Sequence, residues 1–267
     1  MKRAVTILAA LVCVAAGAVR GLDLSAYNDW STGFVTWGSV WTRYGVLAGV
    51  LVLIGVAALA QAPGAFRLTA PRRGLGVYGL VSSVAFAAWA GGQVMLLWPG
   101  RDWFGLVQAG LFFLTGVWLL LTGLVHLGEE LQPPTRSALL GVGATLGFYL
   151  LTVGRFGFAP SSVQRIGPTV EVFSALLALL FSTALVRLLY VGQARSARRL
   201  YFLGFAAFLL CTCLELPQTA LSWRNNAAGT ADLALSGLLA LIGLAGLGAA
   251  WAVSGRREEE APAGGDE

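Results

Sequence analysis

The chain has 267 residues, of which 57% are hydrophobic and 12% are charged, and its formal net charge is +5. Soluble domains carry about 25% charged residues, so a single aqueous core is excluded and the lipid bilayer is the expected solvent and partner. The basic residues lie in short connections between apolar runs and form no basic face, so no nucleic acid partner is expected.

Few side chains could hold a cofactor or a metal ion. Lys2 is the one lysine, which excludes a retinal Schiff base inside a helix bundle. His126 is the one histidine, so neither a bis-histidine haem site nor a histidine-based zinc site can form from this chain alone. The three cysteines form neither a disulfide framework nor a CxxC metal pattern. The sequence therefore predicts no cofactor and no metal site.

The first apolar run, Ala4–Val19, follows a basic start and has two interpretations. It is either a short, retained membrane span or a secretory signal that is cleaved after the small residues at 16–18. We favour the retained span because the following runs orient consistently with it. Cleavage would remove residues 1–18 and leave seven helices.

The connection Gly21–Arg43 is predicted to be an amphipathic helix in the headgroup zone. Its aromatic residues recur at alternating spacings of three and four, which is helical periodicity, and polar residues fill the other face. Gly33 and Gly38 weaken this prediction. The aromatic residues are Tyr27, Trp30, Phe34, Trp37, Trp41 and Tyr44.

Seven further apolar runs each have about the 20 residues that a helix needs to cross the hydrocarbon core. Backbone groups in lipid must pair within their own segment, so these runs are helices. The fold class is therefore all-α, a polytopic transmembrane bundle of about eight helices. The seven runs are Tyr44–Ala62, Gly74–Trp98, Phe104–His126, Ser137–Phe156, Pro168–Tyr190, Leu200–Ala220 and Leu233–Ser254.

The distribution of Lys and Arg predicts the orientation. If all eight runs cross, twelve of the eighteen basic residues fall on the side of the N-terminus and six on the other side. By the positive-inside rule both termini are cytoplasmic. We expect a multi-pass protein of the plasma (inner) membrane of a prokaryote.

Residues 1–254 are predicted to form a single transmembrane domain, followed by a disordered cytoplasmic tail at 255–267, which is acidic and rich in Gly and Pro. Paired arginines precede the third and the seventh run at an offset of 126 residues. This offset suggests a repeat of four plus four spans, 1–130 and 137–254. The alternative is that any evenly spaced chain of eight helices looks two-fold.

Two carboxylates are unexpected among the later apolar runs. Glu171 follows Pro168 by three residues, so it lies in or near the first turn of a helix, where the helix dipole favours a negative charge. Glu215 lies about fifteen residues after Leu200, roughly 22 Å into the crossing at 1.5 Å per residue. A charge there is costly unless it faces a cavity, a partner or water. Glu215 therefore either snorkels to the outer surface or faces the bundle interior.

Glu171 and Glu215 lie on adjacent antiparallel runs, so both fall toward the outer side and can approach each other. Two close carboxylates could share a proton or hold a cation. Arg155 and Arg165 are the counter-charges on the same side. The candidate transport or ion site therefore consists of Glu215, Glu171, Arg155 and Arg165.

The function that we expect is that of a small-solute or ion-coupled transporter-like protein. The alternative is a noncatalytic membrane subunit or sensor that acts through a membrane protein partner, with homo-oligomerisation also open. An enzyme is not expected, because the sequence has no Walker A, GxSxG or paired-aspartate motif.

Overall fold

The computed structural model describes residues 2–68, 73–128, 133–158, 165–191, 193–194 and 196–255. Apart from Gly255, the predicted disordered tail lies outside the described residues. The helices are α1 (Lys2–Tyr27), α2 (Val40–Leu59), α3 (Arg73–Leu97), α4 (Trp103–Leu127), α5 (Leu139–Phe158), α6 (Ile166–Val191), α7 (Ala197–Ala207), the π-helix η1 (Phe208–Glu215), α8 (Leu216–Arg224) and α9 (Thr230–Ser254). The strands are β1 (Phe66–Arg67) and β2 (Gln193–Ala194).

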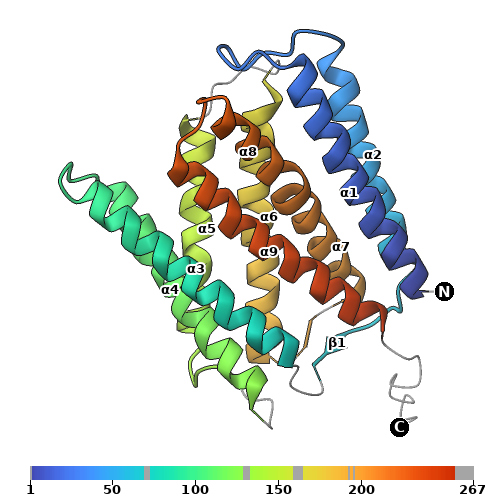
Figure 1. Ribbon diagram of the computed structural model, residues 1–267. Helices are drawn as coiled ribbons and strands as arrows, with labels where there is room; N and C mark the ends of the chain where they lie inside the picture. Colours follow the sequence, from blue (N-terminus) through green and yellow to red (C-terminus); the bar gives the residue numbers. More distant parts are fainter. Residues whose placement is uncertain are drawn as a thin grey trace.

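Eight helical segments are long and apolar enough to cross a membrane, and α7, η1 and α8 together make the seventh. The predicted all-α bundle of eight spans is confirmed, and the chain is a multi-pass membrane protein. Helix α1 begins and α9 ends at the same end of the bundle (Figure 1), where the Arg3 guanidinium lies 5.7 Å from the Trp251 ring centroid. An even number of crossings requires this arrangement. The cytoplasmic location of that end stays a prediction.

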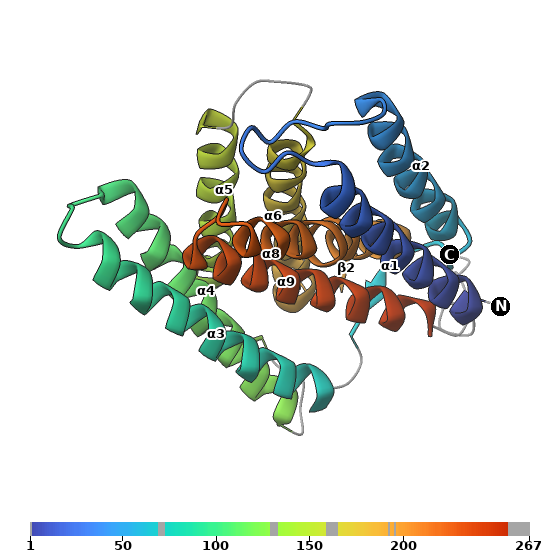
Figure 2. The ribbon, with the colours of Figure 1, turned by 45° about the horizontal axis from the view of Figure 1, so that its top comes forward.

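The seventh span is the most buried of the described spans. It packs against α9, α6, α1 and α2, whereas α3 and α4 form a hairpin that reaches the other helices through α5 and α9. The second view shows α1 with α2 and α3 with α4 on opposite sides of this central span (Figure 2). The four-plus-four repeat stays a prediction.

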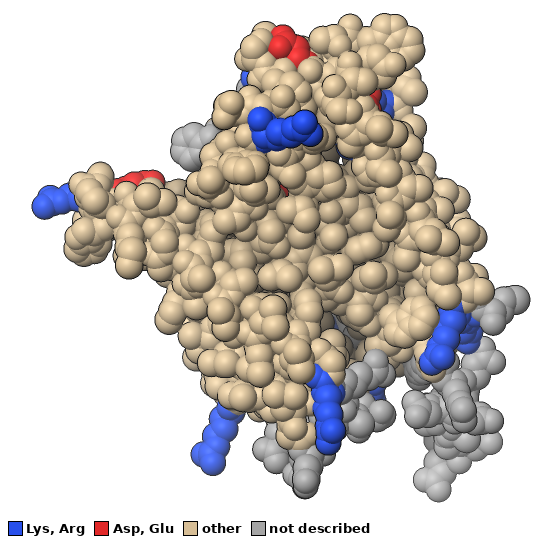
Figure 3. Space-filling model, viewed as in Figure 1, with Lys and Arg blue, Asp and Glu red and all other residues tan. Residues whose placement is uncertain are grey.

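Charged residues are sparse on the visible outer face of the molecule (Figure 3). On the face in Figure 3, most Lys, Arg, Asp and Glu lie toward the top, the bottom and the projection at the left, and the broad band between them is almost entirely uncharged. A band of this kind suits the hydrocarbon core, from which charges are excluded by their cost of desolvation.

The predicted amphipathic helix at Gly21–Arg43 is wrong. Helix α1 continues to Tyr27, and an irregular loop then runs to Ser39, before α2 begins. Gly33 and Gly38 have φ values of +72° and +80°, which a helix cannot accommodate. The alternation of aromatic residues therefore follows from a helix end, a loop and a helix start, and not from one amphipathic face.

The Asp29 side chain holds the turn of this loop. Its carboxylate accepts hydrogen bonds from Thr32 Oγ1 at 2.6 Å and from Ser31 Oγ at 2.7 Å. These hydrogen bonds lower the pKa of Asp29 from 3.8 to about 2, and the bond from Thr32 has the largest effect. A lowered pKa means that the ionised, hydrogen-bonded form persists as the pH falls until about 2. The loop geometry should therefore be insensitive to pH over the physiological range.

The connections at the other end of the bundle are tied together. Strands β1 and β2 pair antiparallel, with Phe66 opposite Ala194. Arg198 Nε also donates to the carbonyl of Gln61 at 3.0 Å. These bonds link the start of the seventh span to the connection after α2, so the central helix is fixed where it enters the bundle.

Helices α7 and α9 cross at a pair of glycines. A Cβ on Gly204 or on Gly246 would collide with the main-chain carbonyl of the other residue. Small residues at membrane helix crossings allow backbones to approach this closely. The crossing fixes the position of α7, which continues directly into the π-helix.

Gly246→Ala is expected to lower the free energy of unfolding by about 1–3 kcal/mol, because the added methyl group forces α7 and α9 apart. Gly248→Ala is the matched control in the same helix, since a Cβ there meets no atom within 4 Å. Its stability should be unchanged or slightly raised, because Ala is the better helix former. Denaturant titration of both variants in micelles checks the prediction, and equal effects at the two positions would contradict it.

Candidate functional site

The site is built around the π-helix η1 at the middle of the seventh span. Eight residues, Phe208–Glu215, adopt the wider π turn. Pro217 follows in the next turn and has no N–H to return to the carbonyl of Cys213, its acceptor in a regular α-helix. A π-helical stretch, with i→i+5 hydrogen bonds, is rare in proteins. Where one occurs, it is often at a functional site.

Neighbouring helices support the π-helix with side-chain hydrogen bonds and close contacts. Ser174 Oγ of α6 donates to the carbonyl of Leu210 at 3.2 Å, and Thr212 Oγ1 donates to the carbonyl of Ala240 in α9 at 2.9 Å. The carbonyl of Cys213 approaches Gly17 of α1 so closely that a Cβ would not fit. The π-helix is therefore held from three sides.

Glu215, the last residue of η1, is fully buried and forms an ion pair with Arg155 of α5. Arg155 Nη2 lies 2.6 Å from Glu215 Oε1, and Arg155 Nη1 lies 3.2 Å from Oε2. The exposed fractions of the two side chains are 15% for Arg155 and 0% for Glu215. Of the two predicted orientations of Glu215, the structure has the one that faces the bundle interior.

Glu171 lies beside this pair but is held differently. Arg155 Nη1 donates to the main-chain carbonyl of Glu171 at 2.6 Å. The Glu171 carboxylate accepts one long hydrogen bond, from Gln218 Nε2 at 3.4 Å, and forms no ion pair with any described residue. Glu171 is thus a half-buried carboxylate whose charge is the least compensated in the site.

Arg165, the fourth candidate, does not join the two glutamates. Its guanidinium lies 4.8 Å from the centroid of the Phe34 ring in the α1–α2 loop, which is a cation–π contact. Its buried Nε atom has no hydrogen-bond partner among the described residues. Arg165 therefore anchors the start of α6 to the loop.

Sequence reasoning missed a second group of charges, on α1 and α2. Arg20 Nη2 lies 3.4 Å from Gln218 Oε1, and Arg20 Nη1 lies 2.8 Å from Asp23 Oδ2. Arg43 also donates to Asp23, from Nε at 2.9 Å. The signal was present: Arg20 and Asp23 lie three apart on one helix face, as do Glu215 and Gln218.

These residues form one polar seam from α5 to α2, which we define as Arg155, Glu215, Glu171, Gln218, Arg20, Asp23 and Arg43. It contains three guanidinium groups and three carboxylates, so its formal charge is zero when all are ionised. Taking ions out of water costs several kcal/mol each, and pairing repays this only with good geometry. A neutral seam is the arrangement in which so many ionisable groups can be buried together.

The side chains of the seam are not grouped as metal ligands. In the part of the chain that the structure describes, no three His, Cys, Asp or Glu side chains are grouped to hold a metal ion. Its chemistry is that of guanidinium and carboxylate groups, which can bind charged ligands and, at the carboxylates, exchange protons.

We compared the chain with known proteins. No known protein family matches the chain, and neither the curated proteins nor the solved structures contain a match.

Proposed function

We propose that this protein is a transporter-like membrane protein for a small solute or ion, with Glu215, Arg155 and Glu171 as its coupling site. The observation that supports this most is the bidentate Arg155–Glu215 pair, fully buried at Glu215, inside a membrane-spanning bundle. Apolar side chains of similar volume would stabilise a bundle at least as well. Ionisable residues in membrane spans commonly mark ion or substrate pathways.

In the proposed mechanism Glu171 is the group that takes up a proton or a cation. Its carboxylate is half-buried, has no ion-pair partner among the described residues and lies next to the Arg155 guanidinium. When Glu171 is neutralised, Arg155 is attracted to Glu215 alone. When Glu171 is charged, the two carboxylates compete for Arg155.

The π-helix supplies an element with two arrangements. Each hydrogen bond of a π-helix spans one more residue than that of an α-helix, so reversion to regular α-helix would shift the residues on one side of it. Glu215 is the last residue of η1, so such a shift would change its distance to Arg155. The charge on Glu171 would thus bias the conformation of the central span, which is the requirement for coupling.

The test is solute-driven proton movement in proteoliposomes that contain a pH-sensitive dye. Amino acids, sugars, carboxylates, nucleosides and inorganic cations are added one class at a time. The intact protein is expected to give proton entry with at least one class, and Glu171→Gln is expected to reduce that rate to the rate of protein-free liposomes. Asp102→Asn is the control, because Asp102 caps the exposed start of α4.

Two outcomes would contradict the proposal. One is the absence of protein-dependent proton or solute flux with every class of solute. The other is a Glu171→Gln variant that keeps the flux of the intact protein. Co-purification of another membrane protein in place of flux would support the alternative function, a noncatalytic subunit or sensor.

A further inference from the structure

A cavity of about 440 Å³ lies between α1 and α2, with α6 and η1 behind it. Most of its wall is aliphatic, including Leu47, Val50, Leu209 and Leu214. The cavity shares Arg20, Asp23 and Arg43 with the polar seam but is not lined by Glu215 or Arg155. It is therefore a different site from the coupling site, connected to it through the Arg20–Gln218 hydrogen bond.

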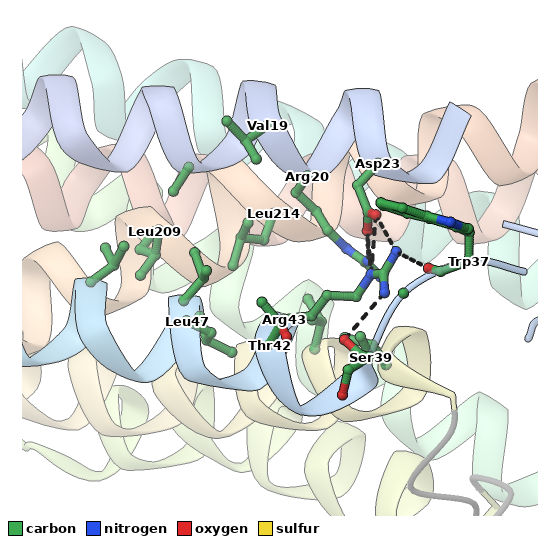
Figure 4. Close-up of a pocket in the computed structure, with 16 residues that line it drawn as sticks. Val19, Arg20, Asp23, Trp37, Ser39, Thr42, Arg43, Leu47, Leu209 and Leu214 are labelled. Atoms are coloured by element: carbon green, nitrogen blue, oxygen red, sulfur yellow. Dashed lines mark hydrogen bonds and ion pairs between the residues drawn. The ribbon is translucent and has the colours of Figure 1, made fainter. Parts of the chain in front are cut away.

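The polar and the aliphatic residues that line the cavity lie at opposite ends of it. Figure 4 shows Arg20, Asp23, Arg43 and Trp37 at one end and the aliphatic residues toward the other. A water-soluble solute would have to leave the aliphatic part unfilled or desolvate its polar groups there, which is unfavourable. A molecule that matches both ends has an alkyl chain and a polar head.

The charge of the polar end of the cavity determines which head group a ligand can carry. Two guanidinium groups, of Arg20 and Arg43, face one carboxylate, of Asp23, so the residues that line this end have a formal charge of +1. The carboxylate that makes the whole seam neutral is that of Glu171, which does not line the cavity. The buried Nε of Arg20 has no hydrogen-bond partner among the described residues and is a donor left over. One negative charge on the head would neutralise the end, whereas a cationic head would be repelled.

The cavity is lined on α1 and α2 by exposed apolar side chains. Val19 of α1 and Val46 of α2, which both line it, are 61% and 53% exposed. Both lie within helices that are long and apolar enough to span a membrane, and the expected surroundings of such helices are lipid. A ligand can therefore reach the cavity from the bilayer, between the first two spans.

We propose that the α1–α2 cavity binds a single-chain amphiphile with one negative charge, such as a long-chain alkyl carboxylate, its head at Arg20 and its chain along α2. One alkyl chain fits the single cavity, whereas a two-chain phospholipid would leave its second chain outside. Binding here does not require the proposed transport, and it is measured without any flux.

The test uses the full chain in nanodiscs of zwitterionic lipid at alkaline pH, where a carboxylate is ionised. The probe is stearate with a nitroxide close to its carboxylate, which quenches nearby tryptophan fluorescence. Saturable quenching is expected, and Trp37→Phe should remove it because Trp37 lines the polar end. The methyl ester of the same probe and a nitroxide-labelled phosphatidylglycerol should quench weakly and without saturation.

Variants locate the binding. Arg20→Gln should weaken the affinity for labelled stearate by about tenfold or more, because the head group of the ligand loses one charge-assisted hydrogen bond. Val46→Phe should weaken it as well by narrowing the opening, and it should fold normally because Val46 is exposed to lipid. Arg224→Gln, at the exposed end of α8, is the matched control and should bind as the intact protein does.

Three results would overturn the proposal. The first is equal quenching by the acid, the ester and the two-chain lipid, which would mean ordinary partition into the surrounding bilayer. The second is saturable binding of the two-chain lipid in preference to the acid. The third is unchanged affinity in both Arg20→Gln and Val46→Phe.

Discussion

Arg155→Met is expected to lower the free energy of unfolding by about 3–5 kcal/mol, the cost of leaving a buried charge without its partner. The Glu215 carboxylate is fully buried, and Arg155 supplies both of its hydrogen bonds from a guanidinium. No other described basic residue forms an ion pair with it. The same magnitude is expected for Glu215→Leu, which leaves the Arg155 guanidinium without a carboxylate.

The double variant Arg155→Met/Glu215→Leu should recover most of this loss. Replacing both members of a buried ion pair by apolar residues of similar volume is often neutral or stabilising. Denaturant titration in mixed micelles measures all three variants. Additive losses in the double variant would show that the two residues act independently, contrary to the 2.6 Å contact between them.

Asp23→Asn is expected to have two opposite effects. Stability should fall by about 1.5–3 kcal/mol, the range for hydrogen bonds to charged groups, because Arg20 and Arg43 lose their shared carboxylate. The three side chains are only 12–20% exposed, so solvent screens this loss little. The affinity for labelled stearate should rise by about tenfold, because the charge of the cavity end increases from +1 to +2 and both guanidinium groups become free to donate.

Unfolding and nitroxide quenching on the same preparation separate these effects. The compensating variant Asp23→Asn/Arg43→Gln returns the end to a charge of +1, so its affinity should return toward that of the intact protein. A fall in affinity with Asp23→Asn would mean that Asp23 orients the two guanidinium groups for the ligand, and not that it competes with the ligand.

The helical bundle could be predicted because apolar runs of membrane length are explicit in the sequence. The ends of the helices could not. The apolar run stops at Val19, yet α1 continues to Tyr27 and contains an ion pair between Arg20 and Asp23 within the helix. The sequence shows where charged residues stand, but not which of them form ion pairs.

The aromatic spacing after Tyr27 predicts a helix where the structure has a loop. Spacings of three and four among aromatic residues show that the segment has helical periodicity, but they do not show whether its backbone can form a helix. The positive φ values of Gly33 and Gly38 override that periodicity, and the hydrogen bonds of Asp29 define the turn.

The residues of the proposed coupling site could be named in advance, but their geometry could not. Glu215 and Glu171 were conspicuous as carboxylates among apolar runs, and Arg155 as a nearby cation. The direction of the Glu215 side chain depends on the π-helix, because i→i+5 bonding changes the rotation from one residue to the next and Glu215 is the last residue of η1. The partners on α1 and α2 depend on which helices pack together, and no local pattern contains that information.

The most direct test of the central claim, that the Arg155–Glu215 pair serves coupling and not only folding, is the flux of the double variant Arg155→Met/Glu215→Leu. This variant is expected to fold as the intact protein does, so its flux reports the function of the pair alone. Solute-driven proton entry into proteoliposomes should fall to the rate of protein-free liposomes. A folded double variant that moves solute and protons at the rate of the intact protein would contradict the claim.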